Sequence, residues 1–348
     1  MPAAAETAAE TAADIARHSW ENPGAFEVSP GVHRIPLPLP GDGLKAVNVY
    51  VIDDGDEVVL IDGGWALDES VDLLATGLES IGYGLEHIRE FLCTHLHRDH
   101  YTQAVAIRRT HGGKVSVGAG EQACLDLIRT IDHHPDVVRM RIAGATEIAH
   151  ELAAVTGEHD LTNWEDPDRW LPNGLDIELT TRTLRVIETP GHTRGHVVFH
   201  DPKNNALFAG DHVLPHITPS IGVEINRPPS PLRDYLSSLE LVRAMPDSRL
   251  FPAHGPVADS VHDRIDELLA HHGERLADTA AAVAKGAATG FEAARALSWT
   301  RRKRRYDDMD FFNRILAVHE TMAHLAVLVE RGVLTRSDVD GVAHFAVR

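Results

Sequence analysis

Apolar residues in the first half of the chain form short runs that alternate with segments of helical periodicity. Strand-length runs rich in Val, Ile and Leu occur at 31–35, 46–52, 57–61, 88–93 and 114–117. Residues 67–81 carry apolar side chains at helical spacing and begin with two acidic residues, which favours a helix there. Residues 101–107 also read as a helix. This alternation of strands and helices predicts a layered α/β domain.

The second block of strands has a different arrangement. Apolar runs at 176–179, 184–188, 196–200 and 206–209 are separated by polar turns such as 201–205, which is typical of an antiparallel sheet. A helix is predicted at 231–245 and a last strand at 250–251. The proline-rich stretch 36–40 is interpreted as a connection between the first two strands.

The chain divides into three parts by these patterns. Residues 1–25 form a helical or disordered lead, 26–258 form the main domain, and 259–348 form a small, mostly helical domain. The main domain contains an insertion at about 121–173 that reads as mostly helical. In the last part, helices are predicted at 261–269, 280–285, 291–297 and 311–329, with a short strand at 342–347.

Composition narrows the classes of function. With 52 acidic and 33 basic residues the net charge is −19, which disfavours nucleic acid as a partner. Only Cys93 and Cys124 are present, so we expect no disulfide framework. No run of about 18 apolar residues supports a membrane span, and 1–16 lacks the basic start and apolar core of a signal peptide. We therefore expect a cytoplasmic protein with no membrane partner.

One stretch, residues 94–100, stands out for its chemistry. It places His95, His97, Asp99 and His100 within six residues, between a predicted strand and a predicted helix. In an extended backbone, residues two apart project to the same side. Imidazole and carboxylate are good ligands for zinc and for other divalent metals. A solvated polar loop rich in histidine explains this density less well than a metal site does.

The stretch resembles the HxHxDH motif of the metallo-β-lactamase superfamily. Further resemblances to the family's motifs follow in the expected order, at Ile61-Asp62-Gly63-Gly64, Pro190-Gly191-His192-Thr193, Gly210-Asp211-His212 and Pro252-Ala253-His254-Gly255. Together they cover roughly residues 26–258. The resemblance implies a four-layer αββα sandwich, and the end of the chain resembles the winged-helix-like domain that some members carry.

The resemblance also implies a binuclear metal site. One metal would be held by His95, His97 and His192, the other by Asp99, His100 and His254, with Asp211 bridging the two. Zinc is the first expectation for both ions, with iron and manganese left open. A hydroxide shared by the two metals would be the nucleophile.

Three polar residues receive further roles from the resemblance. Asp99 would act as the catalytic carboxylate that orients the hydroxide and passes a proton to the leaving group. Asp62 and His196 would fix the orientation of the metal ligands, although a turn cap and a polar residue at a strand end explain them equally well.

The predicted reaction is hydrolysis of a small acyl substrate, namely a thioester, an ester or a lactone. Alternatives within the family are an endoribonuclease or phosphodiesterase, and a β-lactam hydrolase, because fold and metal site alone do not choose among these. A metal-binding protein without catalysis is a third hypothesis, which the complete ligand set disfavours. Homo-oligomerisation stays open.

Two segments outside the motifs invite functional readings. By the same resemblance, the insertion at 121–173 is expected to be a substrate-covering lid, although no substrate-binding residue is assigned. Candidates for lining its pocket are His133, His134, Arg139, Trp164 and Trp170. The basic run 301–305 suggests a nucleic-acid contact. Because Asp307, Asp308 and Asp310 follow it directly, a solvated or subunit-contact surface is the preferred interpretation.

Overall fold

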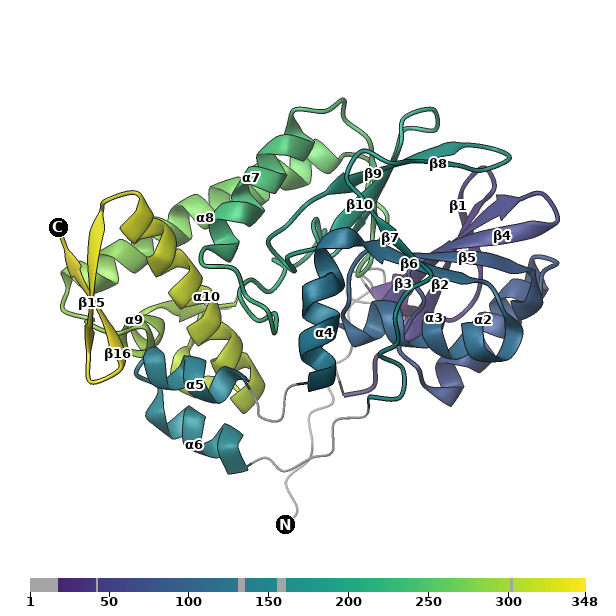
Figure 1. The fold of residues 1–348 in the computed structure, drawn as a ribbon. Helices are drawn as coiled ribbons and strands as arrows, with labels where there is room; N and C mark the ends of the chain where they lie inside the picture. The colour runs from purple at the N-terminus through teal and green to yellow at the C-terminus, as the bar shows by residue number, and fades with distance from the viewer. Residues whose placement is uncertain (1–17, 42, 131–134, 155–160, 301–302) are drawn as a thin grey trace, which may run out of the picture.

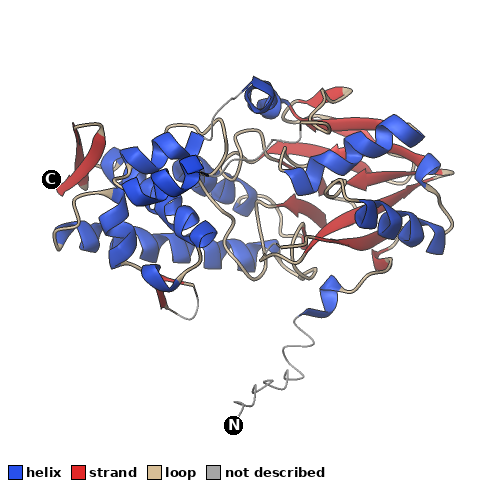
Figure 2. Ribbon diagram, turned by 90° about the horizontal axis from the view of Figure 1, so that it is seen from below, coloured by secondary structure: helices blue, strands red, loops and turns tan. Residues whose placement is uncertain are grey.

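The structure has a sheet-rich part on one side and a helical part that carries the C-terminus on the other (Figure 1). This computed structural model describes residues 18–348 apart from 42, 131–134, 155–160 and 301–302. The view from below separates the same two parts, with the strands gathered beside one helical group (Figure 2). No helix in the described residues is long and apolar enough to cross a membrane.

The first sheet follows the chain in order. Its seven strands are β1 (Phe26–Ser29), β2 (Val32–Pro38), β3 (Ala46–Asp54), β4 (Glu57–Ile61), β5 (Ile88–Cys93), β6 (Lys114–Gly118) and β7 (Arg169–Leu171). Strands β1 to β4 pair antiparallel, with Val51 opposite Leu60 in β3 and β4. Strands β4 to β7 pair parallel.

The second sheet has five strands in the order β12-β11-β10-β9-β8. They are β8 (Asp176–Glu178), β9 (Thr183–Glu188), β10 (Val197–Asp201), β11 (Ala206–Gly210) and β12 (Arg249–Pro252). Strands β8 to β11 form an antiparallel meander, and β12 pairs parallel with β11. Strands β9, β11 and β12 therefore point the same way.

Helices surround the two sheets and build the C-terminal part. They are α2 (Asp68–Ser80), α3 (Arg98–His111), α4 (Gln122–Thr130), α5 (Pro135–Ile142), α6 (Thr146–Ala154), α7 (Pro231–Arg243), α8 (Val261–Ala284), α9 (Gly290–Ala296) and α10 (Phe311–Glu330). Side-chain caps mark three of their starts, where Ser260, Thr289 and Asp310 each accept a hydrogen bond from a backbone N–H of the first turn. Two short hairpins complete the fold, β13 (Ser298–Trp299) with β14 (Arg304–Arg305) and β15 (Leu334–Val339) with β16 (Val342–Val347).

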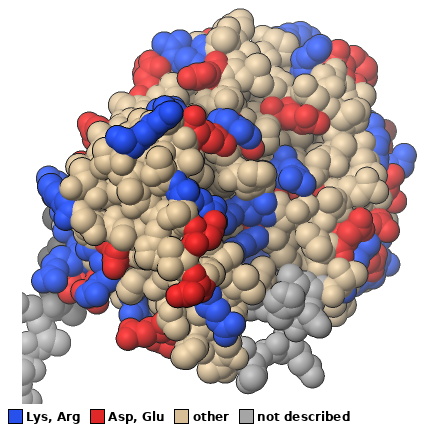
Figure 3. Space-filling model, turned by 60° about the vertical axis from the view of Figure 1, so that its left-hand side comes forward, with Lys and Arg blue, Asp and Glu red and all other residues tan. Residues whose placement is uncertain are grey.

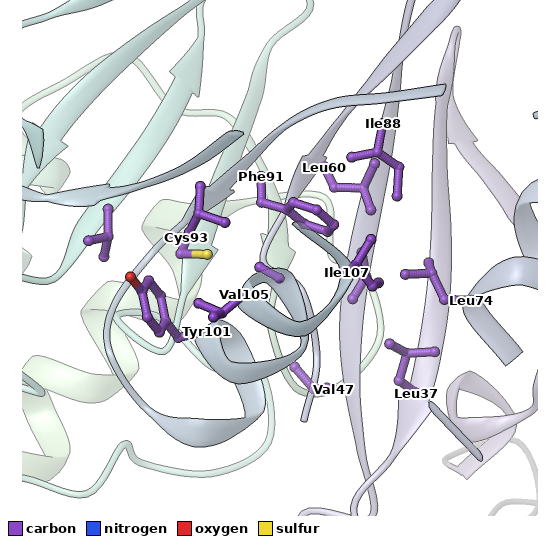
Figure 4. Packing of buried hydrophobic residues seen from close by; sticks show 14 of the residues in the cluster. Leu37, Val47, Leu60, Leu74, Ile88, Phe91, Cys93, Tyr101, Val105 and Ile107 are labelled. Atoms are coloured by element: carbon purple, nitrogen blue, oxygen red, sulfur yellow. The ribbon is translucent and has the colours of Figure 1, made fainter. Parts of the chain in front are cut away.

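Three apolar layers stack through the main domain. Tyr50 and Leu92 of the first sheet pack against Phe199, Phe208 and Phe251 of the second, which fills the space between the sheets. The outer face of the first sheet is covered by α2 and α3, with the buried side chains that Figure 4 labels lying between strands and helices. The outer face of the second sheet is covered by α7, α8 and α10. The predicted αββα sandwich is confirmed.

The inserted helices α5 and α6 belong to the helical part. Their buried residues Met140 and Ile148 share one apolar cluster with Trp299 and Tyr306 and with Val318 of α10. Segments far apart in sequence therefore build one core. That these helices cover a substrate stays a prediction.

Strand β2 continues through Pro36 and Pro38, which the sequence reading placed in a connection. Both prolines pair with β3 on one side, opposite Asn48 and Ala46. On the other side β1 pairs only with residues 32–34, so that edge of β2 is open. Proline is tolerated there because the missing N–H faces no neighbouring strand.

Other differences concern short or split elements. Strands β1, β7, β13, β14 and β15 were not predicted, and β7 lies within the insertion that reads as helical. The predicted helices at 261–269 and 280–285 are one continuous helix, α8. His133, His134 and the first two residues of the basic run lie outside the described residues.

The shared core predicts how a cavity mutation in α6 affects stability. Ile148 is 2% exposed, so Ile148→Ala should lower the free energy of unfolding by about 2 to 4 kcal/mol. Urea unfolding followed by circular dichroism measures this. The matched control is Val138→Ala in α5, because Val138 is 49% exposed and should change the stability little. Equal losses in the two variants would contradict the packing described here.

Candidate metal centre

Within each sheet, the motif residues follow the carboxyl ends of strands that run parallel to one another. Asp62 follows β4, the 94–100 stretch follows β5, His192 follows β9, Asp211 follows β11 and His254 follows β12. Parallel strands present their carboxyl ends at one edge of a sheet. A hydrogen bond from Val197 N to Thr94 O, 2.9 Å long, joins the edges of the two sheets at this point.

The turn from β5 into α3 arranges the first four side chains. His97 is the N-cap of α3 and keeps an extended backbone, while Asp99 and His100 lie in the first turn of the helix. The extended segment brings the rings of His95 and His97 to a centroid distance of 4.5 Å. The helical turn then directs His100 back to within 4.0 Å of the His95 ring. The negative charge of Asp99 at the N-terminus of the helix also interacts favourably with the helix dipole.

The structure brings all seven predicted ligands into two adjacent groups. His95, His97, His192 and Asp211 offer atoms within 4.8 Å of one another. A second group with the same spacing contains Asp99, His100 and His254. The seven residues come from four connections that lie far apart along the chain, so only the folded protein assembles them.

Asp211 lies between the groups with one oxygen toward each. Its Oδ2 is 3.3 Å from His192 Nε2. Its Oδ1 is 3.2 Å from His254 Nε2 and 3.7 Å from His100 Nε2. This is the placement that a carboxylate bridging two cations requires.

Several atoms at the centre of the site are buried and make no hydrogen bond within the described residues. They are His95 Nε2, His100 Nε2, His254 Nε2 and Asp211 Oδ1. Buried polar atoms without a partner are costly. Imidazole nitrogens and a carboxylate converging in this way are a borderline-metal donor set, so the residues present fit divalent cations.

In three of the histidine rings the other nitrogen, Nδ1, contacts an oxygen atom of the protein. His254 Nδ1 donates to Ala46 O at 2.7 Å, and His192 Nδ1 donates to Ser220 O at 2.8 Å. His95 Nδ1 lies 3.0 Å from Thr94 Oγ1. Such contacts fix the tautomer and leave Nε2 free for a metal. His97 instead presents its Nδ1, which lies 3.1 Å from His192 Nε2.

Asp62 connects His100 to Thr94 through its carboxylate. Its Oδ2 accepts from His100 Nδ1 at 2.9 Å, and its Oδ1 accepts from the backbone N–H of Thr94 at 2.7 Å. Thr94 Oγ1 also donates to Asp62, at 3.0 Å. Asp62 has a φ of 61°, a left-handed conformation that is uncommon outside glycine. The hydrogen bonds to Thr94 and His100 stabilise this strained backbone conformation.

His196 supports Asp211 from behind. Its Nε2 accepts from the backbone N–H of Asp211 at 3.1 Å, while its Nδ1 lies 2.9 Å from Thr189 Oγ1. The preceding Gly210 has a φ of 50°, and a Cβ there would lie 2.7 Å from His196 Nε2 and from Thr94 Oγ1. Glycine is therefore required for Asp211 to follow the strand end this closely.

The histidines of the site differ in the direction in which their pKa values are shifted. Burial, aided by His192, lowers the pKa of His97 to about 3, and burial with three neighbouring imidazoles lowers that of His95 well below its usual value. These rings are neutral, as metal ligands must be. Burial also disfavours charge on His100, but the carboxylates of Asp99, Asp62 and Asp211 outweigh it and raise its pKa. A cation in the second group would take the place of that proton.

Two carboxyl groups that the motifs do not include lie near the turn that follows His192. Glu121 accepts a hydrogen bond from Thr193 Oγ1, and burial raises its pKa to about 7. Burial and the nearby Glu121 raise the pKa of Glu224 to about 8. Sequence reasoning missed both, because single glutamates carry no motif and their burial depends on the fold.

Three residues that the sequence suggested as pocket-lining are instead engaged in packing or in hydrogen bonds with the protein. Trp164 and Trp170 pack against the core beneath the first sheet, and Trp164 stacks on Tyr101 with ring centroids 6.3 Å apart. Arg139 donates to Asp136 and to Ile225 O at 3.1 and 2.7 Å. Cys93 and Cys124 are buried free thiols.

A protein-family comparison agrees with this geometry. The family model described as the metallo-beta-lactamase superfamily matches residues 42–123 and 127–254. The chain belongs to the metallo-beta-lactamase superfamily. The matched region contains every residue of the two ligand groups.

Curated relatives within the superfamily are distant. The lactamase-like protein ptaB of Pestalotiopsis fici is 26% identical over 70% of this chain and 62% of its own length. The beta-lactamase-like protein 2 homolog of Caenorhabditis elegans is 26% identical over 67% of this chain and 63% of its own. The chain thus spans less than two thirds of the length of these relatives.

Two solved structures of superfamily proteins match more of the chain. A family protein from Thermus thermophilus has a TM-score of 0.76 at 26% identity and covers 92% of this chain and 100% of its own. A beta-lactamase domain protein from Burkholderia ambifaria has a TM-score of 0.77 at 26% identity, with 93% of each chain covered. Coverage this high includes most of the C-terminal helical part.

The contacts of Asp62 predict its effect on metal binding. Asp62→Ala removes the acceptor for His100 Nδ1 and the bonds to Thr94, so metal affinity should fall by about 10- to 100-fold. Competition with a metal-sensitive dye measures this. Asp176→Ala, at an exposed position of β8, is the control. Unchanged affinity in the Asp62 variant would contradict a role in orienting the site.

The raised pKa of Glu224 predicts a dependence of stability on pH. The folded state keeps the Glu224 proton up to about pH 8, whereas the unfolded state loses it at a lower pH, so this group costs stability as pH rises through that window. Glu224→Gln should therefore stabilise the protein by about 1 to 3 kcal/mol more at pH 8 than at pH 5. Thermal unfolding at both pH values measures the difference. The exposed Glu147→Gln is the control, and the same difference in both variants would contradict the assignment.

Proposed function

We propose that the protein is a metal-dependent hydrolase that cleaves an acyl thioester. The observation that carries this is Asp211, with one carboxylate oxygen toward each of the two groups of candidate ligand atoms. In this proposal His95, His97 and His192 would hold one metal, and Asp99, His100 and His254 would hold the other. Asp211 would contribute one carboxylate oxygen to each. Zinc suits this set of donors, as do iron and manganese.

The chain's own residues prepare the site for hydrolysis. Metal ions bound there supply Lewis acidity toward the substrate carbonyl and activate water. Asp99 Oδ2 lies 3.4 Å from His100 Nε2 and 3.5 Å from His254 Nε2. The side chain of Asp99 is 15% exposed, more than the 7% of Asp211. This greater exposure supports the proposal that the Asp99 carboxylate takes up a proton at the site and gives it to the leaving group.

The names of relatives favour a thioester among the acyl substrates. Proteins of Cryptosporiopsis sp. and Aspergillus terreus, 25% and 27% identical to this chain, are named atrochrysone carboxyl ACP thioesterases. The aligned segments cover 60% and 51% of those proteins. The thiolate of a thioester is a good leaving group, so one proton donor at the site suffices.

One experiment compares the proposed thioester with the substrates of the alternative hydrolase functions. Metal-loaded protein is offered an acyl thioester, an aryl ester, a lactone, a β-lactam and a single-stranded RNA. The thioester should be cleaved with the highest kcat/KM. In Asp211→Asn, which keeps the shape of the side chain, turnover should fall by more than about 100-fold because the bridge between the groups loses its charge.

Asp72→Asn at an exposed position of α2 is the matched control and should leave turnover unchanged. Metal content is measured for every variant, so that loss of an ion is seen directly. Cleavage of RNA alone, lost in the Asp211 variant, would replace the thioester proposal by the nuclease alternative. Full activity of Asp211→Asn would contradict the metal mechanism itself.

A further inference from the structure

The loop between β11 and α7, residues 211–230, joins the metal site to a second cavity. At one end it carries Asp211, and further along Ser220 O holds His192. At its other end it contributes Arg227 to a cavity of about 210 Å³ against α10 and the β15–β16 hairpin. This volume is smaller than that of pockets for whole drug-sized ligands, so it suits one chemical group of a longer molecule.

The cavity combines two cations with an apolar wall. Arg227 and Arg336 line it together with Met322, Phe345 and Glu330. Glu330 is already engaged, because its carboxylate accepts from Arg233 at 3.2 Å and from Ser230 Oγ at 3.0 Å. Arg336 donates to the exposed Asp338 at 2.9 Å. The positive charge of Arg227 is therefore the least compensated in the cavity.

Arg227 makes no hydrogen bond or ion pair within the described residues. Asp136, whose charge also acts on Arg227, lies 3.1 Å from Arg139 and 3.0 Å from His319. Burial, with the charges of Arg139 and Arg336, lowers the pKa of Arg227 to about 10, so it stays charged at neutral pH. A half-buried guanidinium without an acceptor is a binding site for an anion, and phosphate matches its geometry.

This concentration of arginines is local. The chain as a whole has a net charge of −19, which repels anions over most of its surface. Figure 3 shows Lys and Arg groups gathered in a hollow at the centre of the face that it draws. A local group of cations can attract an anion despite the negative net charge of the chain.

The distance between the cavity and the metal site can be bounded along the chain. Ser220 O is 2.8 Å from His192 Nδ1, and Gly222 lies two residues further on. A Cβ at Gly222 would be 3.5 Å from Arg227 Cδ. At 3.8 Å per residue the guanidinium is within about 20 Å of the His192 ring. A pantetheine arm has about 13 chain bonds between phosphorus and sulfur, slightly more than four residues have, and so spans about 15 Å when extended.

We propose that Arg227, with Arg336, binds the phosphate of a pantetheine arm whose acyl thioester reaches the metal site. This rests on the proposed thioesterase function and names its substrate class. The shared chemistry, a phosphorylated pantetheine thioester, occurs on coenzyme A and on acyl carrier proteins. Arg227 is then a specificity-determining residue that acts on substrate binding and not on the chemical step.

The test compares one acyl group on 4′-phosphopantetheine and on pantetheine without the phosphate. The native protein should show a kcat/KM about 10- to 100-fold higher for the phosphorylated thioester, through KM. Arg227→Gln should abolish this preference and leave kcat/KM for the pantetheine thioester unchanged. It leaves no acceptor unpaired, because Arg227 donates to none within the described residues. Arg336→Gln should reduce the preference, and the exposed Arg304→Gln is the control that keeps it.

Binding of 4′-phosphopantetheine by calorimetry gives a readout without turnover. The native, metal-loaded protein should bind it, and Arg227→Gln should bind at least about 10-fold more weakly. Thioester hydrolysis with no preference for phosphate and no binding would overturn the subsite and keep the thioesterase. Arg227-dependent binding without any thioester hydrolysis would keep the subsite and overturn the proposed function.

The same acyl group on coenzyme A and on an acyl carrier protein identifies the source. A higher kcat/KM for one of them, lost in Arg227→Gln, assigns that carrier. A preference that persists in the variant would mean that contacts elsewhere recognise the carrier, and would overturn the role of Arg227.

Discussion

The structure depends on one unfavourable arrangement, the burial of ligand atoms that the protein itself does not satisfy. Among the described residues, His95, His100 and His254 each bury an Nε2 that makes no hydrogen bond, and all three belong to the two ligand groups. Left alone, such atoms cost stability. Bound divalent cations would turn this loss of stability into a gain, because the same atoms would then be metal ligands. The sandwich then serves to hold these side chains in place, by aligning five strand ends and fixing the far nitrogen of the rings.

The grouping of the seven candidate ligands could be predicted from the sequence because each of them lies in a short motif that follows a strand. The motifs come in a fixed order, and a strand end directs its following residues to one edge. Asp62 and His196 were also found in this way. The partners Ser220 and Ala46 could not be, because they act through backbone carbonyls whose place depends on loops far away in sequence. The burial of Glu121 and Glu224 has the same origin.

Fold prediction succeeded where periodicity is strong and failed where tertiary context decides. The two sheets and the long helices follow the apolar pattern. Strand β7 has three residues and exists because it pairs with β6. The prolines of β2 are permitted by an open edge that only the register with β1 creates. The joining of α5 and α6 to the C-terminal helices in one core is likewise a long-range contact, which local patterns do not encode.

The central claim is that the seven side chains form a site for two cations per chain. It is tested most directly by counting them. Protein stripped with a chelator and dialysed is titrated with zinc, and bound metal is measured by mass spectrometry together with the protein concentration. The account predicts two tightly bound ions per chain. Saturation at one ion, or no tight binding at all, would contradict it.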